Sequence, residues 1–271
     1  MPRHALSPSG LVLVDKPPGP SSFALVRSVR TATGARAGHA GTLDPFATGL
    51  LLVLVGAATR LARYLVGLDK RYTTIVDLQT RTATGDPEGQ VVEERDPPAA
   101  SELEGRLQGL RGEIDLRIPA ASAVKIGGER AYRLARRGVV VEMPMRRSVV
   151  HALELLRFDG RRAELELHVS SGTYIRAIAD ALGGHCETLR RTAVGPFDVA
   201  AADSMRIIAP VDALAFLPAV ALSAEEAVAI RCGRALARSV DPGPVRLVAD
   251  GALVGVGREC AGRVRPETVL P

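Results

Sequence analysis

The alternation of hydrophobic and polar positions along this chain predicts a succession of strands and helices. Two short apolar runs, 11–15 and 50–55, are typical of buried strands. Alternating patterns predict further strands, which cover 70–79, 90–94, 148–158 and 161–169. Asp159-Gly160 separates the last two, and an Asp-Gly pair between alternating runs is a strong hairpin signal. Helices are predicted between the strands, at 23–33, 57–66, 102–110, 129–137 and 177–182.

From about residue 221 the pattern becomes that of a small β-rich unit. A helix ends near Gly233, and two short strands follow at 245–249 and 252–257, joined by the hairpin pair Asp250-Gly251. We therefore predict a main domain over 1–218 and a small C-terminal domain over 219–271.

The composition indicates a globular protein without a membrane segment. Of the 271 residues, 46% are hydrophobic and 24% are charged, which is ample material for a core. No window approaches the roughly 18 consecutive apolar residues of a membrane span. The N-terminus lacks the apolar stretch of a secretory signal. We expect a cytoplasmic protein with no membrane partner.

Cysteines and histidines give no indication of a metal site. The three cysteines are odd in number and far apart, and the five histidines show no metal-ligand spacing. The sequence therefore predicts no metal and no metal-dependent catalysis.

A net charge of +5 favours a polyanionic partner. Only Lys16, Lys70 and Lys125 are lysines, so the other 32 of the 35 basic residues are arginines, an imbalance that a genome-wide arginine bias would also produce. The segment at about 119–147 is basic and punctuated by glycine, and it includes the predicted helix 129–137. Two interpretations of this helix are open. Its basic face is simply solvated, or the helix belongs to a protruding arm that binds a phosphate backbone.

Asp44 is the first candidate for chemistry. It precedes Pro45, which disfavours the helical conformation, and it lies among Gly38, Gly41 and Gly49, which permit unusual backbone shapes. The predicted strand 50–55 follows directly and would anchor the loop in the core. An Asp-Pro pair that merely opens a turn is the alternative.

Arg176 is the second candidate. It lies in the motif Ser171-Gly172-Thr173-Tyr174-Ile175-Arg176, which opens a predicted helix. A cation in the first turn is unfavourable for the helix dipole, so we expect a compensating carboxylate, and Asp44 is the candidate. The alternative is a side chain that points to solvent.

Four segments in order, 10–19, 38–49, 70–72 and 171–176, resemble the TruB family of tRNA pseudouridine synthases. The likeness extends from residue 10 to about 200. It implies an α+β fold, with a mixed, mainly antiparallel central sheet flanked by helices and a C-terminal PUA-like RNA-binding domain. It also implies an isomerase that converts uridine 55 in the T-loop of tRNA to pseudouridine after base flipping, without a cofactor. The expected partner is the T-stem-loop of tRNA, and the expected state is a monomer.

The resemblance also assigns roles residue by residue. It implies that Asp44 is catalytic, that Arg176 pairs with it, and that Tyr72 stacks on the uracil and assists proton removal. Substrate-binding roles are implied for His39, Tyr72, Tyr174, Leu189, Lys16 and Lys125. The segment at about 119–147 corresponds to the family's RNA-gripping insertion. The spacer between Arg176 and Leu189 is shorter than in many relatives, which makes the assignment of Leu189 the least secure.

Two other classes of function are weighed against this enzyme. An RNA-folding chaperone or binding module would use Asp44 only structurally, and loss of Asp44 would then spare its activity. A zinc-dependent base deaminase would need H-x-E with P-C-x-x-C, and the sequence contains neither motif.

Overall fold

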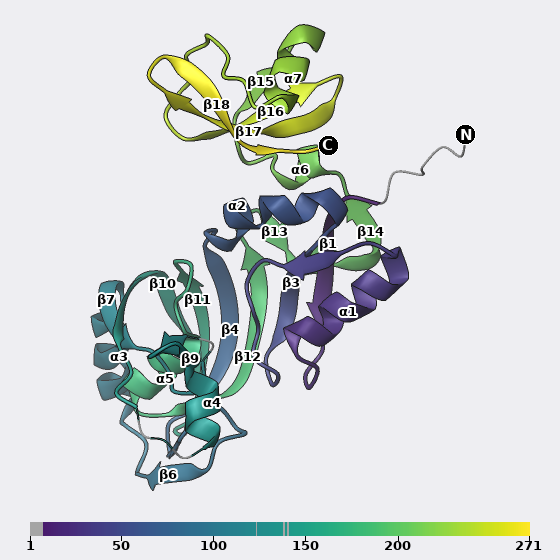
Figure 1. Ribbon diagram of the computed structural model, residues 1–271. Helices are drawn as coiled ribbons and strands as arrows, with labels where there is room; N and C mark the ends of the chain where they lie inside the picture. The colour runs from purple at the N-terminus through teal and green to yellow at the C-terminus, as the bar shows by residue number, and fades with distance from the viewer. Residues whose placement is uncertain (1–7, 123, 138, 140) are drawn as a thin grey trace.

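The computed structural model describes residues 8–122, 124–137, 139 and 141–271. A ten-stranded, mainly antiparallel sheet forms its centre (Figure 1). The strand order is β14-β1-β3-β12-β4-β11-β10-β7, with β2 beside β3 and β13 beside β12, and β3 and β12 form a parallel pair. The predicted α+β class is confirmed. The strands span β1 Gly10–Lys16, β2 Ala37–His39, β3 Thr48–Val55, β4 Lys70–Asp77, β7 Gly112–Arg117, β10 Met145–Phe158, β11 Arg162–Val169, β12 His185–Val194, β13 Phe197–Asp198 and β14 Asp203–Ile208.

Seven α-helices occur in the described ranges, and none is long and apolar enough to cross a membrane. Their bounds are α1 Ser22–Thr33, α2 Ala62–Val66, α3 Ala100–Gly109, α4 Ala131–Arg136, α5 Ile175–Leu182, α6 Pro210–Ala213 and α7 Ala224–Arg231. Most agree with the predicted helices to within a few residues.

Two predicted helices are shorter than expected, for local reasons. The helix predicted over 57–66 begins as the 3-10 helix η1 (Gly56–Leu61), in which the Thr59 hydroxyl donates to the Gly56 carbonyl at 2.8 Å and competes with regular helical bonding. The helix predicted from 129 starts at 131. Glu129–Arg130 instead forms strand β9, which pairs with β8 (Lys125–Ile126) across two glycines with positive φ.

Strand β3 explains why residues 50–55 are continuously apolar. Leu50, Leu52 and Leu54 contribute to an apolar cluster that includes η1 and α2. The intervening Leu51, Val53 and Val55 pack in another cluster with Val26 and Val29 of α1. Both faces of β3 are therefore buried, and the strand fixes the end of the Asp44 loop in the core.

Strand β12 was not predicted, although it lies in the middle of the sheet. Its central residues include Glu187, Thr188, Arg190 and Arg191, which give no apolar alternation. Arg191 is nevertheless 1% exposed, because backbone carbonyls satisfy its guanidinium. A strand that buries hydrogen-bonded polar side chains cannot be recognised from hydrophobic periodicity.

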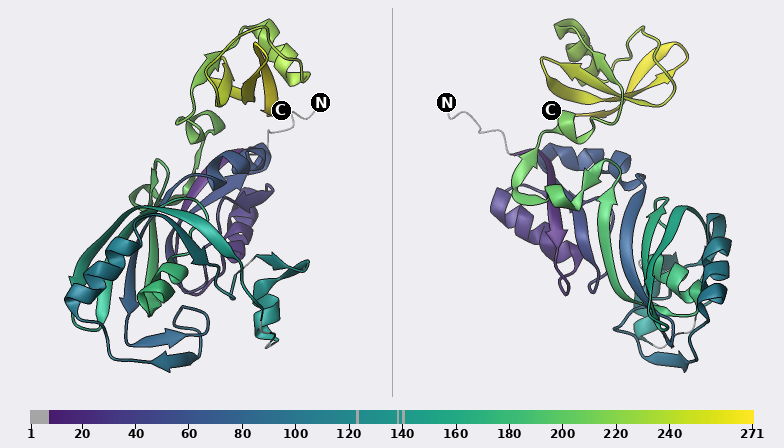
Figure 2. Two further views of the ribbon diagram at one scale, coloured as in Figure 1. Left: turned by 90° about the vertical axis from the view of Figure 1, so that its left-hand side faces the viewer. Right: turned by 180° about the vertical axis from the view of Figure 1, so that it is seen from behind.

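The C-terminal unit is a four-stranded sheet in the order β15-β16-β17-β18, packed with α7. Its strands span β15 Ala219–Ala221, β16 Pro244–Ala249, β17 Ala252–Cys260 and β18 Arg263–Val269. The sheet lies beside η1 and α2 in Figure 1, where the Tyr64 hydroxyl is 3.0 Å from Thr268 Oγ1 and Arg60 donates to the Val269 carbonyl at 2.9 Å. At the other end of the molecule, the segment with β8, β9 and α4 projects from the body (Figure 2).

Candidate active site around Asp44 and Arg176

The structure brings Asp44 and Arg176 into direct contact. Asp44 lies in the loop between β2 and β3, and Arg176 lies in the first turn of α5. Arg176 Nε donates to Asp44 Oδ2 at 2.9 Å, which is the ion pair expected from the sequence. The Arg176 side chain is 2% exposed, whereas that of Asp44 is 33% exposed. The Asp44 carboxylate is therefore accessible to solvent, while the guanidinium that holds it is buried.

The Arg176 guanidinium also fixes two further segments of backbone. Its Nη1 donates to the Thr84 carbonyl at 2.6 Å and its Nη2 to the Ala121 carbonyl at 2.8 Å, while Asp86 Oδ2 lies 3.6 Å from Nη1. All three guanidinium nitrogens are thus engaged, each with a different partner. A planar fork of donors suits this task better than a single ammonium group.

Lys16 holds the backbone on the C-terminal side of Asp44. Its Nζ donates to the carbonyls of Pro45 at 2.8 Å, Ala47 at 2.6 Å and Pro17 at 3.0 Å. The side chain is completely buried, and burial lowers the pKa of Lys16, against the opposing effect of Asp44. These contacts hold the shape of the loop, and the substrate-binding role that the resemblance implies for Lys16 stays a prediction.

We expect Lys16→Met to lower the free energy of unfolding by about 1–3 kcal/mol, because the buried Ala47 carbonyl loses the Lys16 donor at 2.6 Å. The Pro45 carbonyl keeps one donor, since Gly19 N also donates to it at 2.9 Å. The substitution should also lower turnover, since the Asp44 loop loses its support. Thermal melts and initial rates measure the two effects. Lys125→Met is the matched control, because Lys125 is exposed and should leave the melting temperature unchanged. Equal stability of the two variants would rule out this role for Lys16.

Two residues that sequence reasoning missed support the other side of the loop. The Ser22 hydroxyl donates to the Leu43 carbonyl at 2.9 Å and accepts from the Leu43 amide at 2.8 Å. Arg191 donates to the carbonyls of Leu50 at 2.7 Å and Gly41 at 3.1 Å. Ser21 is the N-cap of α1, and no sequence pattern marks its neighbour Ser22 as a contact of the Asp44 loop. Nothing in the sequence distinguished Arg191 from the other arginines.

Gly49 allows β3 and β12 to meet beside this loop. Its φ is +100°, and a Cβ added there would lie 2.2 Å from the Arg191 carbonyl oxygen. Any other residue would separate β3, the strand that follows the Asp44 loop, from β12, the strand that carries Leu189.

Tyr72 and Leu189 belong to an apolar cluster that also contains chain neighbours of the ion pair. Both are 7% exposed. That cluster includes Leu43 and Ala47, which flank Asp44, and Ile175, which precedes Arg176. Tyr174 is half-buried and packs against the same cluster. The structure thus joins Asp44 to Arg176 directly, and it packs Tyr72 and Leu189 in the cluster that holds the apolar residues beside this pair in the sequence.

His39 ends strand β2, close to the same loop. Its Nδ1 is buried and has no hydrogen-bond partner among the described residues. Burial, together with the Arg191 guanidinium, lowers the pKa of His39, which favours the neutral imidazole. A buried nitrogen without a partner is a feature that a bound ligand could satisfy.

Lys125 lies apart from these residues, exposed on the β8–β9 hairpin. This hairpin and α4 form the projecting segment of Figure 2. The base of the segment is attached to the site, because Ile118, Ala131 and Met143 pack with Tyr174. The Ala121 carbonyl, which accepts from Arg176, is a second attachment.

Two family models match the chain. The one described as TruB family pseudouridylate synthase (N terminal domain) covers residues 29–175, and the one described as Pseudouridine synthase II TruB, C-terminal, covers 218–270. A protein named tRNA pseudouridine synthase B from Azoarcus sp. (strain BH72) is 40% identical, over 96% of this chain and 94% of its own length. Another of that name, from Thermobifida fusca (strain YX), is 40% identical over 96% of this chain and 98% of its own.

Solved structures have a similar fold. An H/ACA RNP bound to a substrate RNA containing 2'-deoxyuridine matches with a TM-score of 0.73 and 23% identity, over 97% of this chain and 85% of that chain. A Cbf5-Nop10-Gar1 complex matches with a TM-score of 0.69 and 25% identity, over 92% of this chain and 78% of that chain.

Proposed function

The chain belongs to the TruB family of pseudouridylate synthases, and from that premise we propose that it isomerises uridine 55 in the T-loop of tRNA with Asp44 as the catalytic residue. It is a tRNA-modifying isomerase, as its relatives named tRNA pseudouridine synthase B are. The observation that carries the proposal is the carboxylate of Asp44, one-third exposed and held by the buried Arg176.

The reaction requires the uracil to leave the ribose and return in a different orientation. The bond between N1 and C1′ breaks, a bond between C5 and C1′ forms, N1 gains a proton, and C5 loses one. A carboxylate can act here as a nucleophile or as a proton acceptor. Among the described residues Arg176 occupies Oδ2 of Asp44, which leaves Oδ1 for the substrate.

The neighbouring apolar residues supply a surface for the base. Removing a uracil from a folded loop costs about a few kcal/mol, which stacking and pocket contacts must offset. We assign this contact to the Tyr72 ring and Leu189, with Tyr174 at the edge. His39 would donate or accept a hydrogen bond toward the flipped loop through Nδ1, for which the described part of the chain offers no partner.

Two parts of the chain outside the site are proposed to hold the RNA. The projecting β8–β9 and α4 segment, including Lys125, would contact the phosphate backbone, within a catalytic domain that spans 1–218. The C-terminal domain, 219–271, would act as a PUA-like RNA-binding unit. Recognition by shape and backbone is what structured RNA generally requires.

An isolated T-stem-loop RNA tests the proposed substrate. We expect the chain to convert its uridine 55 to pseudouridine, measured by nucleoside chromatography after digestion. The same stem-loop with cytidine 55 and an anticodon stem-loop of equal length are the controls. Equal conversion of both uridine-containing stem-loops would contradict specificity for the T-loop.

A further inference from the structure

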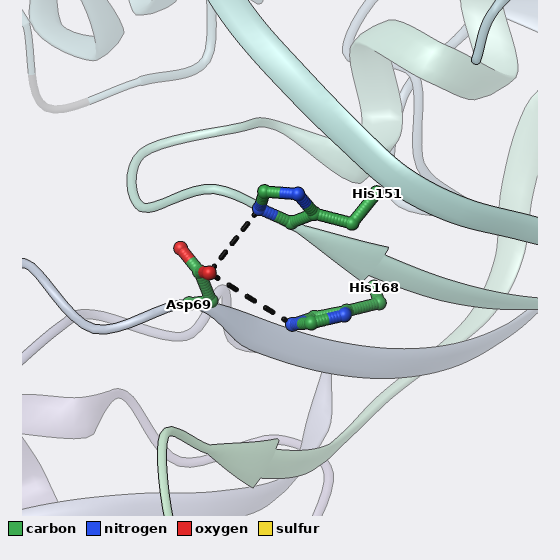
Figure 3. A group of neighbouring side chains, drawn as sticks. All are labelled: Asp69, His151 and His168. Atoms are coloured by element: carbon green, nitrogen blue, oxygen red, sulfur yellow. Dashed lines mark ion pairs between the residues drawn. The ribbon is translucent and has the colours of Figure 1, made fainter. Parts of the chain in front are cut away.

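Three side chains with metal-ligating atoms meet on the sheet outside the candidate active site. Figure 3 shows Asp69 with His151 and His168, whose rings lie one above the other and turn a nitrogen toward the same carboxylate oxygen. Asp69 Oδ2 is 3.2 Å from His151 Nε2 and 3.9 Å from His168 Nε2. One ligand atom from each residue lies within 4.8 Å of the others.

The fold assembles this cluster from three separate segments. Asp69 lies in the turn between α2 and β4, His151 on β10 and His168 on β11. Val150 pairs with Val169 and Ala152 pairs with His168, so the register shifts between these two pairs. His151 is the extra residue of this bulge on β10. Such a bulge redirects a side chain. Here it places the two imidazoles next to each other, with ring centroids 4.8 Å apart.

The cluster lies on the opposite face of the sheet from the candidate active site. Side chains alternate along β11, where Leu167 is buried in the cluster that contains Tyr72. His168, the next residue, therefore points to the other face. The Asp69 and His168 side chains are 44% and 34% exposed, and that of His151 is 37% exposed, so an ion from solvent could reach all three.

We propose that Asp69, His151 and His168 form a binding site for a divalent transition metal ion such as Zn²⁺. Two imidazole nitrogens and one carboxylate oxygen are ligands that zinc prefers. Bond lengths of about 2.0–2.1 Å place tetrahedral ligands roughly 3.4 Å apart. The observed separations need only small side-chain movements to reach this value, and water would complete the coordination.

The charges around the site are mixed. Arg71 is the register partner of His168 on β4 and would oppose a bound cation. Glu166 lies two residues before His168 on β11, and Glu154 is its cross-strand partner on β10. Both carboxylates would favour a bound cation. The competing interpretation is a carboxylate that only hydrogen-bonds protonated imidazole, without a metal.

The consequence of binding would be structural. The turn that carries Asp69 is already fixed by its neighbours, since Gly195 N donates to the Asp69 carbonyl at 2.8 Å and Lys70 Nζ donates to the Val66 carbonyl at 2.9 Å. A metal ion would join this turn to β10 and β11 and stabilise the start of β4, the strand that carries Tyr72 on its other face. The proposal is independent of the isomerase reaction.

Calorimetric titration of the untagged, chelator-treated full chain with Zn²⁺ tests the site. We expect one equivalent to bind with a Kd below roughly 10 µM. His151→Ala and His168→Ala should each weaken binding more than about tenfold, whereas Glu154→Gln, which removes a charge near the site but no ligand, should change it less than about threefold. Zn²⁺ should raise the melting temperature of the wild type and of the control, but not of the two histidine variants.

A second measurement excludes binding to the exposed thiols of Cys232 and Cys260. The Co²⁺ complex should lack the charge-transfer absorption of a metal bound to thiolate. Three results would each overturn the proposal: no binding by the wild type, equal binding by both histidine variants, or thiolate absorption in the Co²⁺ complex. The His151 and His168 side chains are 37% and 34% exposed, and unchanged melting temperatures without metal would confirm that both variants fold.

Discussion

Replacing Asp44 with asparagine should reduce pseudouridine formation by about 10³-fold or more, with little effect on folding or tRNA binding. The asparagine side-chain oxygen can still accept from Arg176 Nε, as Oδ2 does at 2.9 Å, so the loop keeps its main contact. The amide, however, can neither attack a carbon atom nor accept a proton as a carboxylate does. Single-turnover rates on a tRNA transcript measure the loss.

Asp15→Asn is the matched control for this variant. Asp15 also pairs with an arginine, Arg190, at 2.8 Å, but both side chains are exposed. Surface ion pairs contribute only about 0–1 kcal/mol, so turnover should stay near the wild-type value. If Asp44→Asn retained near-normal turnover, Asp44 would be a structural loop residue, and the RNA-binding module considered from the sequence would become the better interpretation.

Arg176→Lys should lower turnover by more than about 100-fold and also reduce the free energy of unfolding by about 2–4 kcal/mol. The buried guanidinium contacts Asp44, the Thr84 carbonyl and the Ala121 carbonyl through separate nitrogens. An ammonium group at the end of a shorter side chain cannot reach all three. The carboxylate would lose its orientation, and at least one buried carbonyl would lose its donor.

Rates and denaturant titrations of the same preparation separate the two effects. Arg81→Lys is a suitable comparison, because Arg81 also bridges two acidic groups, Glu93 and Asp180, but is 34% exposed. It should cost less than about 1 kcal/mol and leave the rate unchanged. A wild-type rate in Arg176→Lys would show that the ion pair does not position the catalytic carboxylate.

The sequence predicted those parts of the site whose physical cause is local. Asp44 before a proline and a buried strand was recognisable as a constrained carboxylate, and Arg176 at a helix start required an anion. The two met in the structure at 2.9 Å. Ser22 and Arg191 could not be found in this way, because their importance depends on carbonyls brought near them by tertiary folding.

The same limit applies to β12 and to the cluster of Asp69, His151 and His168. Hydrophobic periodicity detects strands with an apolar face, whereas the buried positions of β12 include His185 and Arg191. Metal-site motifs detect ligands that are close in sequence, whereas these three come from one turn and two strands. The prediction of no metal rested on the number of cysteines and on the spacing of cysteines and histidines along the chain, and neither carries information about a bulge in a hairpin.

The most direct test of the central claim is to map pseudouridine at single-nucleotide resolution in a full-length, unmodified tRNA transcript treated with the wild-type chain or with Asp44→Asn. We predict modification at uridine 55 and at no other uridine with the wild-type chain, and none with the variant at equal occupancy of RNA. Modification at another uridine with position 55 untouched, or equal modification by both proteins, would contradict the account.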